Sequence, residues 1–228
     1  MSKGILYGVG VGPGDPELLT LKAARLIRSC DVIAVPHRDK EKCFAYRIAC
    51  GAVPEIREKP VLSIDMPMTH DERLREAAYE AGADAIRSEL EKGRTVAFLT
   101  LGDPSVYSTF AYLAGRIAGR GYETQWVPGV TSFCAGAAAL KVPLCTDREE
   151  LHLIPGGEHA ADALGYPGTK VFMKGELSSL LAALSEADAQ AQAVENCGTE
   201  NERIYRTASE IPTDAGYYLV TIVKEKKA

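Results

Sequence analysis

Several features that define common protein classes are missing from this sequence. No run of apolar residues approaches the ~20 that cross a bilayer. The opening residues, MSKGILYGVG, hold an apolar run too short for a secretory signal peptide. None of the six cysteines forms a C-x-x-C pair, and a chain of 228 residues does not need a disulfide framework, so buried, reduced thiols are favoured. We therefore expect a soluble cytoplasmic protein without a membrane partner.

An excess of positive charge is also missing. Lys and Arg number 26 against 31 Asp and Glu, for a net charge of -5, which argues against a nucleic-acid partner but allows a local basic patch. The four histidines form no ligand cluster with the cysteines, so no metal site is predicted. Hydrophobic residues make up 46% of the chain, enough for a substantial core.

The first half of the chain alternates short β-branched runs with helical patterns. Strands are predicted at residues 4–11, 31–35, 60–64, 95–101 and 123–127, and helices at 17–29, 44–51, 70–92 and 106–120. This alternation favours a parallel sheet covered by helices. The second half has strands at 151–155, 169–173, 191–196, 202–206 and 217–223, the last two with little helix between them, which favours a mixed sheet. We expect two α/β domains, residues 1–128 and 129–228, with a cleft between them.

The glycine-rich stretch GVGVGPGDPELLT, residues 8–20, fails both common phosphate-binding patterns. A dinucleotide fingerprint counted from Gly8 reaches Pro13 at its sixth position, and one counted from Gly10 reaches Asp15. A Walker loop would need Gly-Lys followed by Ser or Thr, which is absent. Phosphate binding is therefore disfavoured for this stretch.

A tight turn accounts for part of the same stretch. Asp15 is predicted to cap the following helix, with Pro16 at its first position. Gly12 and Gly14 permit backbone angles that other residues resist. The turn alone does not explain why so many glycines gather, whereas close approach of the backbone to a ligand does.

Three later stretches have the same organisation, a strand end followed by a glycine-containing turn. They are TLGDPSVYST (100–109), WVPGVTSFCAGAAAL (126–140) and VENCGTENERIY (194–205). Ligands of parallel sheets gather at the carboxyl ends of the strands. Each turn alone is explained by local backbone chemistry, but together they favour a cofactor cleft.

These motifs, in this order and spacing, resemble the tetrapyrrole methylase family of corrin and sirohaem biosynthesis. The resemblance runs from about residue 6 to residue 223; GVGVGPGDPELLT with the GDP turn is specific, whereas PGVTS alone is weak. TLGDPSVYSTFAYL and ELLTLKAARLIRSCDVIAVP are most similar to the branch that methylates C-20 of precorrin-2 or of cobalt-precorrin-2 (cobalt-factor II). The motifs do not distinguish the metal-free substrate from the cobalt-containing one.

The resemblance implies a homodimeric, S-adenosylmethionine-dependent methyltransferase of cobalamin biosynthesis, with the cofactor bound between the two domains of the tetrapyrrole methylase fold. Its product would be S-adenosylhomocysteine. The cofactor contacts implied by the motifs are Pro13, Leu101, Gly102, Asp103, Val106, Thr131, Ser132, Met173, Lys174 and Gly198. Related methylases often have an aromatic residue and then Met where this sequence reads Phe-Met-Lys-Gly, so the Met173–Lys174 register can shift by one.

Methyl transfer from a sulfonium needs little acid–base chemistry. The donor is already activated, and holding the acceptor carbon in line can supply about 7–11 kcal/mol. A general base would help to remove the proton from the acceptor carbon, and Asp103 and Tyr107 are the candidates. Alternatively, Asp103 caps a helix beginning at Ser105 or binds a ribose hydroxyl, and Tyr107 is a buried aromatic residue.

The tetrapyrrole carries carboxylates, so an acidic protein needs local positive charge to bind it. Arg38 and Lys40, in PHRDKEK (36–42), are candidate substrate contacts, although a solvated charge run is the alternative. Gly12, Gly14 and Asp15 are expected to line the substrate trough. Rival interpretations are a tetrapyrrole methylase with another acceptor, a nicotinamide-dependent oxidoreductase and a non-catalytic tetrapyrrole sensor.

Overall fold

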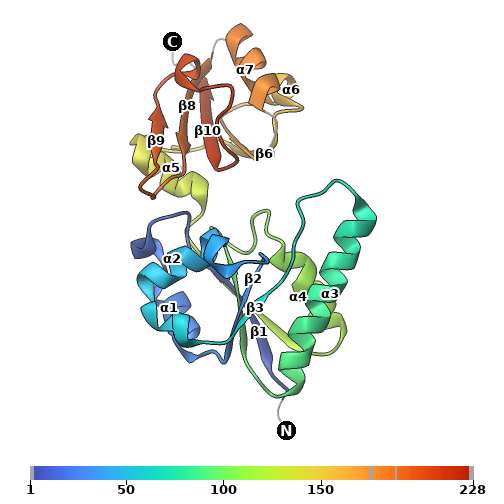
Figure 1. The fold of residues 1–228 in the computed structure, drawn as a ribbon. Coiled ribbons are helices and arrows are strands. Elements are labelled where there is room, and N and C mark those ends of the chain that lie inside the picture. Colours follow the sequence, from blue (N-terminus) through green and yellow to red (C-terminus); the bar gives the residue numbers. More distant parts are fainter. Residues whose placement is uncertain (1–2, 175–176, 188, 226–228) are drawn as a thin grey trace. The chain divides into compact units, whose positions relative to one another are not determined.

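A computed structural model describes residues 3–174, 177–187 and 189–225. The chain forms two units, Met1–Thr131 and Ser132–Ala228, each built around its own five-stranded sheet (Figure 1). The expected α/β fold, with one parallel and one mixed sheet, is confirmed. No helix in the described ranges is long and apolar enough to span a bilayer.

The sheet of the first unit is entirely parallel. Its strands are β1 (Ile5–Gly10), β2 (Val32–Val35), β3 (Val61–Ser63), β4 (Val96–Thr100) and β5 (Glu123–Val127), in the order β3-β2-β4-β1-β5. All residues of β2 and β4 are buried. Such continuous apolar runs are typical of parallel strands covered on both faces.

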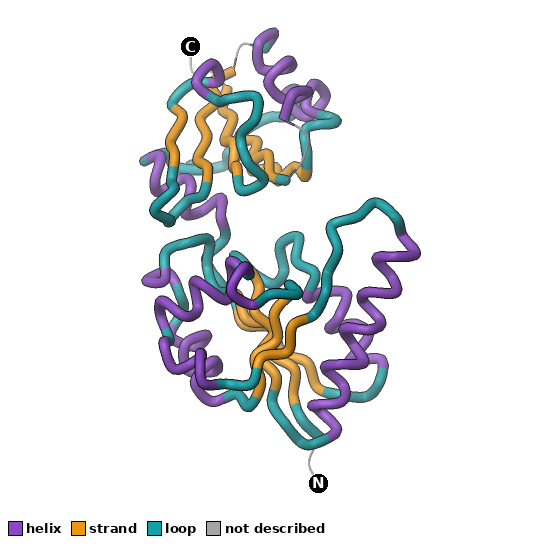
Figure 2. The backbone as a smooth tube through the Cα atoms, viewed as in Figure 1, coloured by secondary structure: helices purple, strands orange, loops and turns teal. Residues whose placement is uncertain are grey.

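Helices cover both faces of this sheet (Figure 2). One face packs against α1 (Leu21–Ser29) and α2 (Phe44–Ala52), and the other against α3 (Glu72–Glu91) and α4 (Phe110–Gly119). Three short 3₁₀ helices, η1 (Pro16–Leu18), η2 (Lys40–Lys42) and η3 (Pro54–Glu58), lie in the connections. The segments that leave the carboxyl ends of the strands are loops, with η1 after β1 and η2 after β2.

Two predicted helices begin later than expected. Asp15 accepts a hydrogen bond from the Glu17 amide at 2.8 Å, but it caps only η1; α1 begins at Leu21 and is capped by Thr20. The predicted helix at 106–120 begins at Phe110. Tyr107 has a φ of 47°, which is incompatible with a right-handed helix, so Asp103 does not cap a helix at Ser105.

The second unit contains a mixed sheet. Its strands are β6 (Leu151–Pro155), β7 (Thr169–Met173), β8 (Ala189–Glu195), β9 (Arg203–Tyr205) and β10 (Leu219–Glu225), in the order β6-β7-β10-β8-β9. The β6–β7 pair is parallel and the others are antiparallel. One face packs against α6 (Ala160–Leu164) and α7 (Leu177–Glu186), while α5 (Ser132–Leu140) contacts β8 and β10 and the 3₁₀ helix η4 (Ala208–Glu210) precedes β10.

The six cysteines are free thiols, but they are not all buried. Burial was expected for the thiols; it holds for Cys30, Cys43, Cys50 and Cys197 and is wrong for Cys134 and Cys145, which are exposed. Burial raises the pKa of Cys30 to about 11. The exposed pair lies in α5 and in the loop that follows it.

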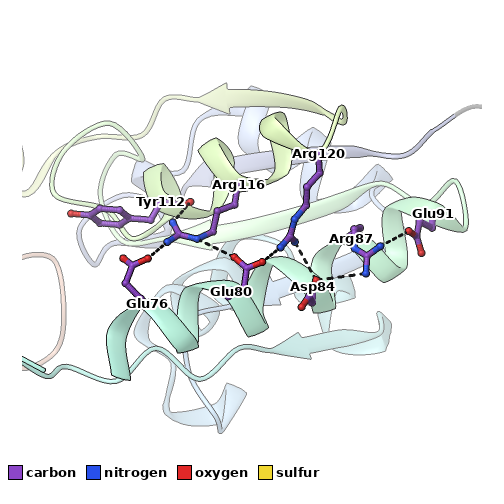
Figure 3. A network of polar contacts seen from close by, with 8 residues as sticks. All are labelled: Glu76, Glu80, Asp84, Arg87, Glu91, Tyr112, Arg116 and Arg120. Carbon is purple, nitrogen blue, oxygen red and sulfur yellow. Dashed lines mark hydrogen bonds and ion pairs between the residues drawn. The ribbon is translucent and has the colours of Figure 1, made fainter. Parts of the chain in front are cut away.

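Alternating acids and arginines join α3 to α4 (Figure 3). Arg116 of α4 pairs with Glu76 and, at 3.5 Å, with Glu80 of α3. Arg120, one turn further, pairs with Glu80 and, at 3.3 Å, with Asp84. The shared carboxylate of Glu80 makes these contacts a network, and networks contribute more to stability than isolated surface ion pairs do.

We expect Arg116→Ala to lower the free energy of unfolding by about 1 kcal/mol, because it removes two ion pairs and a cation–π contact. The Arg116 guanidinium lies 5.3 Å from the centre of the Tyr79 ring. Arg87→Ala is the control, since Arg87 pairs only with Asp84 and Glu91 within α3, and about 0.3–0.5 kcal/mol is expected. Urea denaturation at low and high salt measures both; equal losses would contradict an interhelical role.

Candidate active site

Two loops that leave the carboxyl edge of the first sheet are joined backbone to backbone. The Gly102 amide donates to the Gly12 carbonyl at 2.8 Å, and the Gly12 amide donates to the Gly102 carbonyl at 3.3 Å. The φ angles are 82° at Gly12 and 67° at Gly102, in the left-handed region that favours glycine. The loops after β1 and β4 therefore meet, as their shared position at strand ends predicted.

The loop after β5 packs into the same place. A Cβ on Gly129 would lie 2.1 Å from the Gly102 carbonyl oxygen and 2.8 Å from the Gly10 carbonyl carbon. A Cβ on Gly10 would lie 2.5 Å from the same Gly102 oxygen. Glycine is thus required at 10 and 129 by loop-to-loop packing. The ligand-based explanation for the gathered glycines is not needed at these two positions.

Asp103 holds these three loops together by hydrogen bonds. We call their meeting point, formed by Gly10, Gly12, Gly102 and Gly129, the glycine junction. Its Oδ2 accepts a hydrogen bond from the Gly129 amide at 3.0 Å, and its Oδ1 accepts from the amide of Ser105 at 2.8 Å and from the Ser105 hydroxyl. Burial opposes ionisation of Asp103, but these hydrogen bonds outweigh it and hold its pKa below the ordinary value. A carboxylate so engaged is a weak base, and the geometry favours a positioning role.

The other residues predicted between β4 and α4 lie in the same loop. The Thr100 and Ser108 hydroxyl oxygens are 2.8 Å apart, and Ser108 accepts a hydrogen bond from the Phe110 amide, so this loop is held at both ends. Tyr107 is 42% exposed. The alternative that it is a buried aromatic residue is therefore wrong. Val106 is half-buried.

Thr131 and Ser132 follow β5, and Ser132 is the first residue of α5. The Thr131 hydroxyl oxygen is buried and has no hydrogen-bond partner among the described residues. A buried polar atom without a partner costs stability unless another group satisfies it. A polar group of a bound ligand would do so, and Thr131 therefore fits its predicted role. Pro13 and Gly14 are buried in the loop after β1.

The basic run after β2, residues 36–42, contacts neighbouring residues of the first unit. Arg38 pairs with Asp65 of the segment after β3 at 2.6 Å. The Lys40 ammonium lies 5.6 Å from the centre of the Tyr46 ring, and Asp39 caps η2 through the Glu41 amide. The Arg38 and Asp65 side chains are 78% and 46% exposed, so a solvated charge run, the alternative for PHRDKEK, stays open. The structure does not bring Arg38 or Lys40 into the glycine junction.

In the second unit, Met173 and Lys174 line a cavity of about 130 Å³ at the carboxyl ends of β6 and β7. Lys174 has a φ of 54°, and its ammonium lies 6.0 Å from the centre of the Tyr217 ring. Burial lowers the pKa of Lys174. Gly198, at the exit of β8, is not among the residues lining this cavity.

Sequence reasoning missed several residues that line the cavity. They are Gly156, Gly157, Phe172, Leu177, Leu180, Ala215, Gly216, Tyr217, Leu219 and Thr221. Pro155-Gly156-Gly157 ends a strand with the same organisation as the four stretches that were recognised, so this pair could have been found. Nothing in the sequence pattern marks Gly216 or Tyr217, because they precede a strand.

From the packing of the glycine junction we predict that Gly→Ala lowers stability at position 129 and raises it at position 115. Gly129→Ala forces a Cβ into backbone atoms, so we expect a loss of several kcal/mol or failure to fold. Gly115→Ala lies in α4 with no atom within 4 Å of the added Cβ, and it should stabilise the protein by about 0.5–1 kcal/mol. Thermal and urea denaturation of both variants measures this; a tolerated alanine at 129 would contradict the junction.

Asp103 predicts a pH-dependent contribution to stability. Because its pKa is lowered on folding, its stabilisation is complete above the ordinary pKa of 3.8 and is lost as the pH falls through the lower folded value. Asp103→Ala should cost about 2 kcal/mol at pH 7. The difference from the wild type should shrink below about pH 4. Urea titrations at pH 7 and pH 3 test this, and a difference that is constant with pH would count against it.

Comparison with known proteins agrees with this arrangement. Residues 5–212 match the family model of the tetrapyrrole (corrin/porphyrin) methylases. The chain is 37% identical to the cobalt-precorrin-2 C(20)-methyltransferase of Salmonella typhimurium over 81% of its own length and 79% of that protein. It is 30% identical to the precorrin-2 C(20)-methyltransferase of a Sinorhizobium species over 96% and 95% of the two chains.

Solved structures show the same fold. The uroporphyrin-III C-methyltransferase of Thermus thermophilus, solved with S-adenosylhomocysteine, superimposes with a TM-score of 0.70 at 22% identity. The superposition covers 97% of this chain and 98% of that one. With the family model spanning most of the sequence, the conclusion follows that this chain belongs to the tetrapyrrole methylases.

Proposed function

We propose that this protein transfers a methyl group from S-adenosylmethionine to C-20 of precorrin-2 or cobalt-precorrin-2 in cobalamin biosynthesis. The observation that carries the proposal is its similarity to two proteins named for this reaction, over 81% and 96% of its length. S-Adenosylhomocysteine is the expected product. The four motif stretches that resemble the family include the loops that leave the ends of β1, β4, β5 and β8.

The residues proposed to hold S-adenosylmethionine occur in both units, and we propose that the units act as the two domains. In the first, Leu101 and Gly102 directly precede Asp103 in the loop after β4, and Thr131 offers a buried hydroxyl without a partner among the described residues. In the second, Met173 and Lys174 line the 130 Å³ cavity. The cationic Lys174 suits a carboxylate, such as that of the methionine moiety, in a site where burial strengthens the attraction.

The chain's chemical contribution is mainly positioning. S-Adenosylmethionine, when bound, supplies a methyl group that is already activated. The loop after β4 is fixed at both ends by Thr100–Ser108 and by Asp103, so it presents a rigid wall to the acceptor. Asp103 and Tyr107 are the two proposed candidates for receiving the proton lost from the acceptor carbon: the lowered pKa of Asp103 makes its carboxylate a weakened base, and the exposed Tyr107 hydroxyl could relay a proton only to a further acceptor.

The carboxylates of the tetrapyrrole require cationic partners. We propose Arg38 and Lys40 for this role, with Gly12, Gly14 and Asp15 lining the trough. The exposed Arg38 guanidinium supports this role, because a substrate carboxylate can reach it. The family resemblance also supports a homodimer in the cytoplasm, and sedimentation tests the first of these.

Anaerobic incubation with S-adenosylmethionine and either precorrin-2 or cobalt-precorrin-2, followed by mass spectrometry and NMR, tests the proposal. A gain of one methyl group at C-20 is the expected result, and the faster substrate identifies the metal state. Methylation at another carbon would assign a different tetrapyrrole methylase reaction. If S-adenosylhomocysteine binds but neither substrate gains a methyl group, the proposed acceptor is wrong.

A further inference from the structure

Among the described residues of the second unit, Glu195 is the one buried carboxylate. Glu195, the last residue of β8, is 7% exposed. Its cross-strand neighbour Leu219 belongs to an apolar cluster with Tyr205 and Ile211. A carboxylate in such surroundings is strongly unfavourable unless both its oxygens are hydrogen-bonded.

Both oxygens of Glu195 have partners. The Tyr205 hydroxyl donates to Oε2 at 2.9 Å, and the Gly216 amide donates to Oε1 at 2.6 Å. Burial, reinforced by the neighbouring Glu195 carboxylate, raises the pKa of Tyr205, so the phenol stays protonated as a donor. A Cβ on residue 216 would lie 2.8 Å from Oε1, so a larger residue there would displace the Glu195 carboxylate.

This contact fixes one wall of the cavity that Lys174 lines. Gly216 and its neighbours Ala215 and Tyr217 line that cavity, whereas Glu195 does not. Tyr217 lies under the Lys174 ammonium. The Glu195 carboxylate therefore holds the 215–217 loop, which carries the Tyr217 ring that lines the cavity, without itself lining the cavity.

We propose that Glu195 is a positioning residue for S-adenosylmethionine: it holds the 215–217 loop through the Gly216 amide and so shapes the cofactor cavity without touching the cofactor. The inference rests on the proposed function, in which Met173 and Lys174 contact the cofactor. In this proposal, Glu195 holds the loop by accepting a hydrogen bond, and its negative charge is not needed.

The test compares Glu195→Gln with Glu195→Ala in the full-length protein. Calorimetry gives the Kd for S-adenosylhomocysteine, and kinetics give kcat and the KM for S-adenosylmethionine and for the tetrapyrrole. Glutamine can accept from the Gly216 amide and donate to the Tyr205 oxygen, so its Kd should stay within about twofold of the wild type. Alanine should raise the Kd and the cofactor KM about tenfold, with the tetrapyrrole KM little changed.

Two further variants separate positioning from loss of stability. Val223→Ala truncates a fully buried side chain of β10 that does not line the cavity, so it should lower the Tm and leave the Kd unchanged. Tyr205→Phe removes one of the two hydrogen bonds and keeps the ring, so a rise of about threefold in the Kd is expected even if the alanine variant does not fold.

The outcomes distinguish this inference from the proposed function. If the wild type binds S-adenosylhomocysteine and the alanine and phenylalanine variants bind as tightly, the positioning role is overturned and the proposed function stands. A Glu195→Gln variant as impaired as Glu195→Ala would show that charge is needed and would also overturn it. A wild type that binds no S-adenosylhomocysteine contradicts the proposed function itself.

Discussion

The site in the first unit depends on one constraint, the direct packing of three loop backbones at the carboxyl edge of a parallel sheet. Gly10, Gly102 and Gly129 approach so closely that a methyl group at 10 or 129 would overlap backbone atoms. The Asp103 carboxylate then ties the loop after β4 to the loop after β5. Because these loops are fixed to one another, Leu101–Asp103 and Thr131 keep a defined relation, which a methyl transfer governed by alignment requires.

The two units use the same chemical device. In the first, Asp103 accepts from the Gly129 amide; in the second, Glu195 accepts from the Gly216 amide. In each case a shielded carboxylate holds a glycine whose Cβ would clash with a neighbour. Each amide donates directly to a side-chain oxygen, and glycine lets the backbone approach that oxygen closely. Rigid loops are thereby obtained without large side chains in the site.

The fold was largely predictable because it depends on periodicity. Alternating buried runs and helical stripes placed the ten strands of the described residues within a few residues. The short connection before β10 favoured a mixed sheet, which is observed, although β10 pairs with β7 and β8 and not with the preceding β9. Local sequence did not predict where α4 begins, because the left-handed Tyr107 delays the helix. No local pattern encodes contacts between residues that are distant in sequence. Such contacts include the packing that requires glycine at 10 and 129, the Arg38–Asp65 ion pair and the hydrogen bonds of Glu195.

The central proposal is that the loops of the glycine junction in the first unit bind the methyl donor. A crystal structure of the protein with S-adenosylhomocysteine tests it most directly. We expect a polar atom of the ligand within hydrogen-bonding distance of the Thr131 hydroxyl, and contacts between the ligand and the loop after β4. S-Adenosylhomocysteine bound elsewhere, with the Thr131 hydroxyl still unpartnered, would contradict the account.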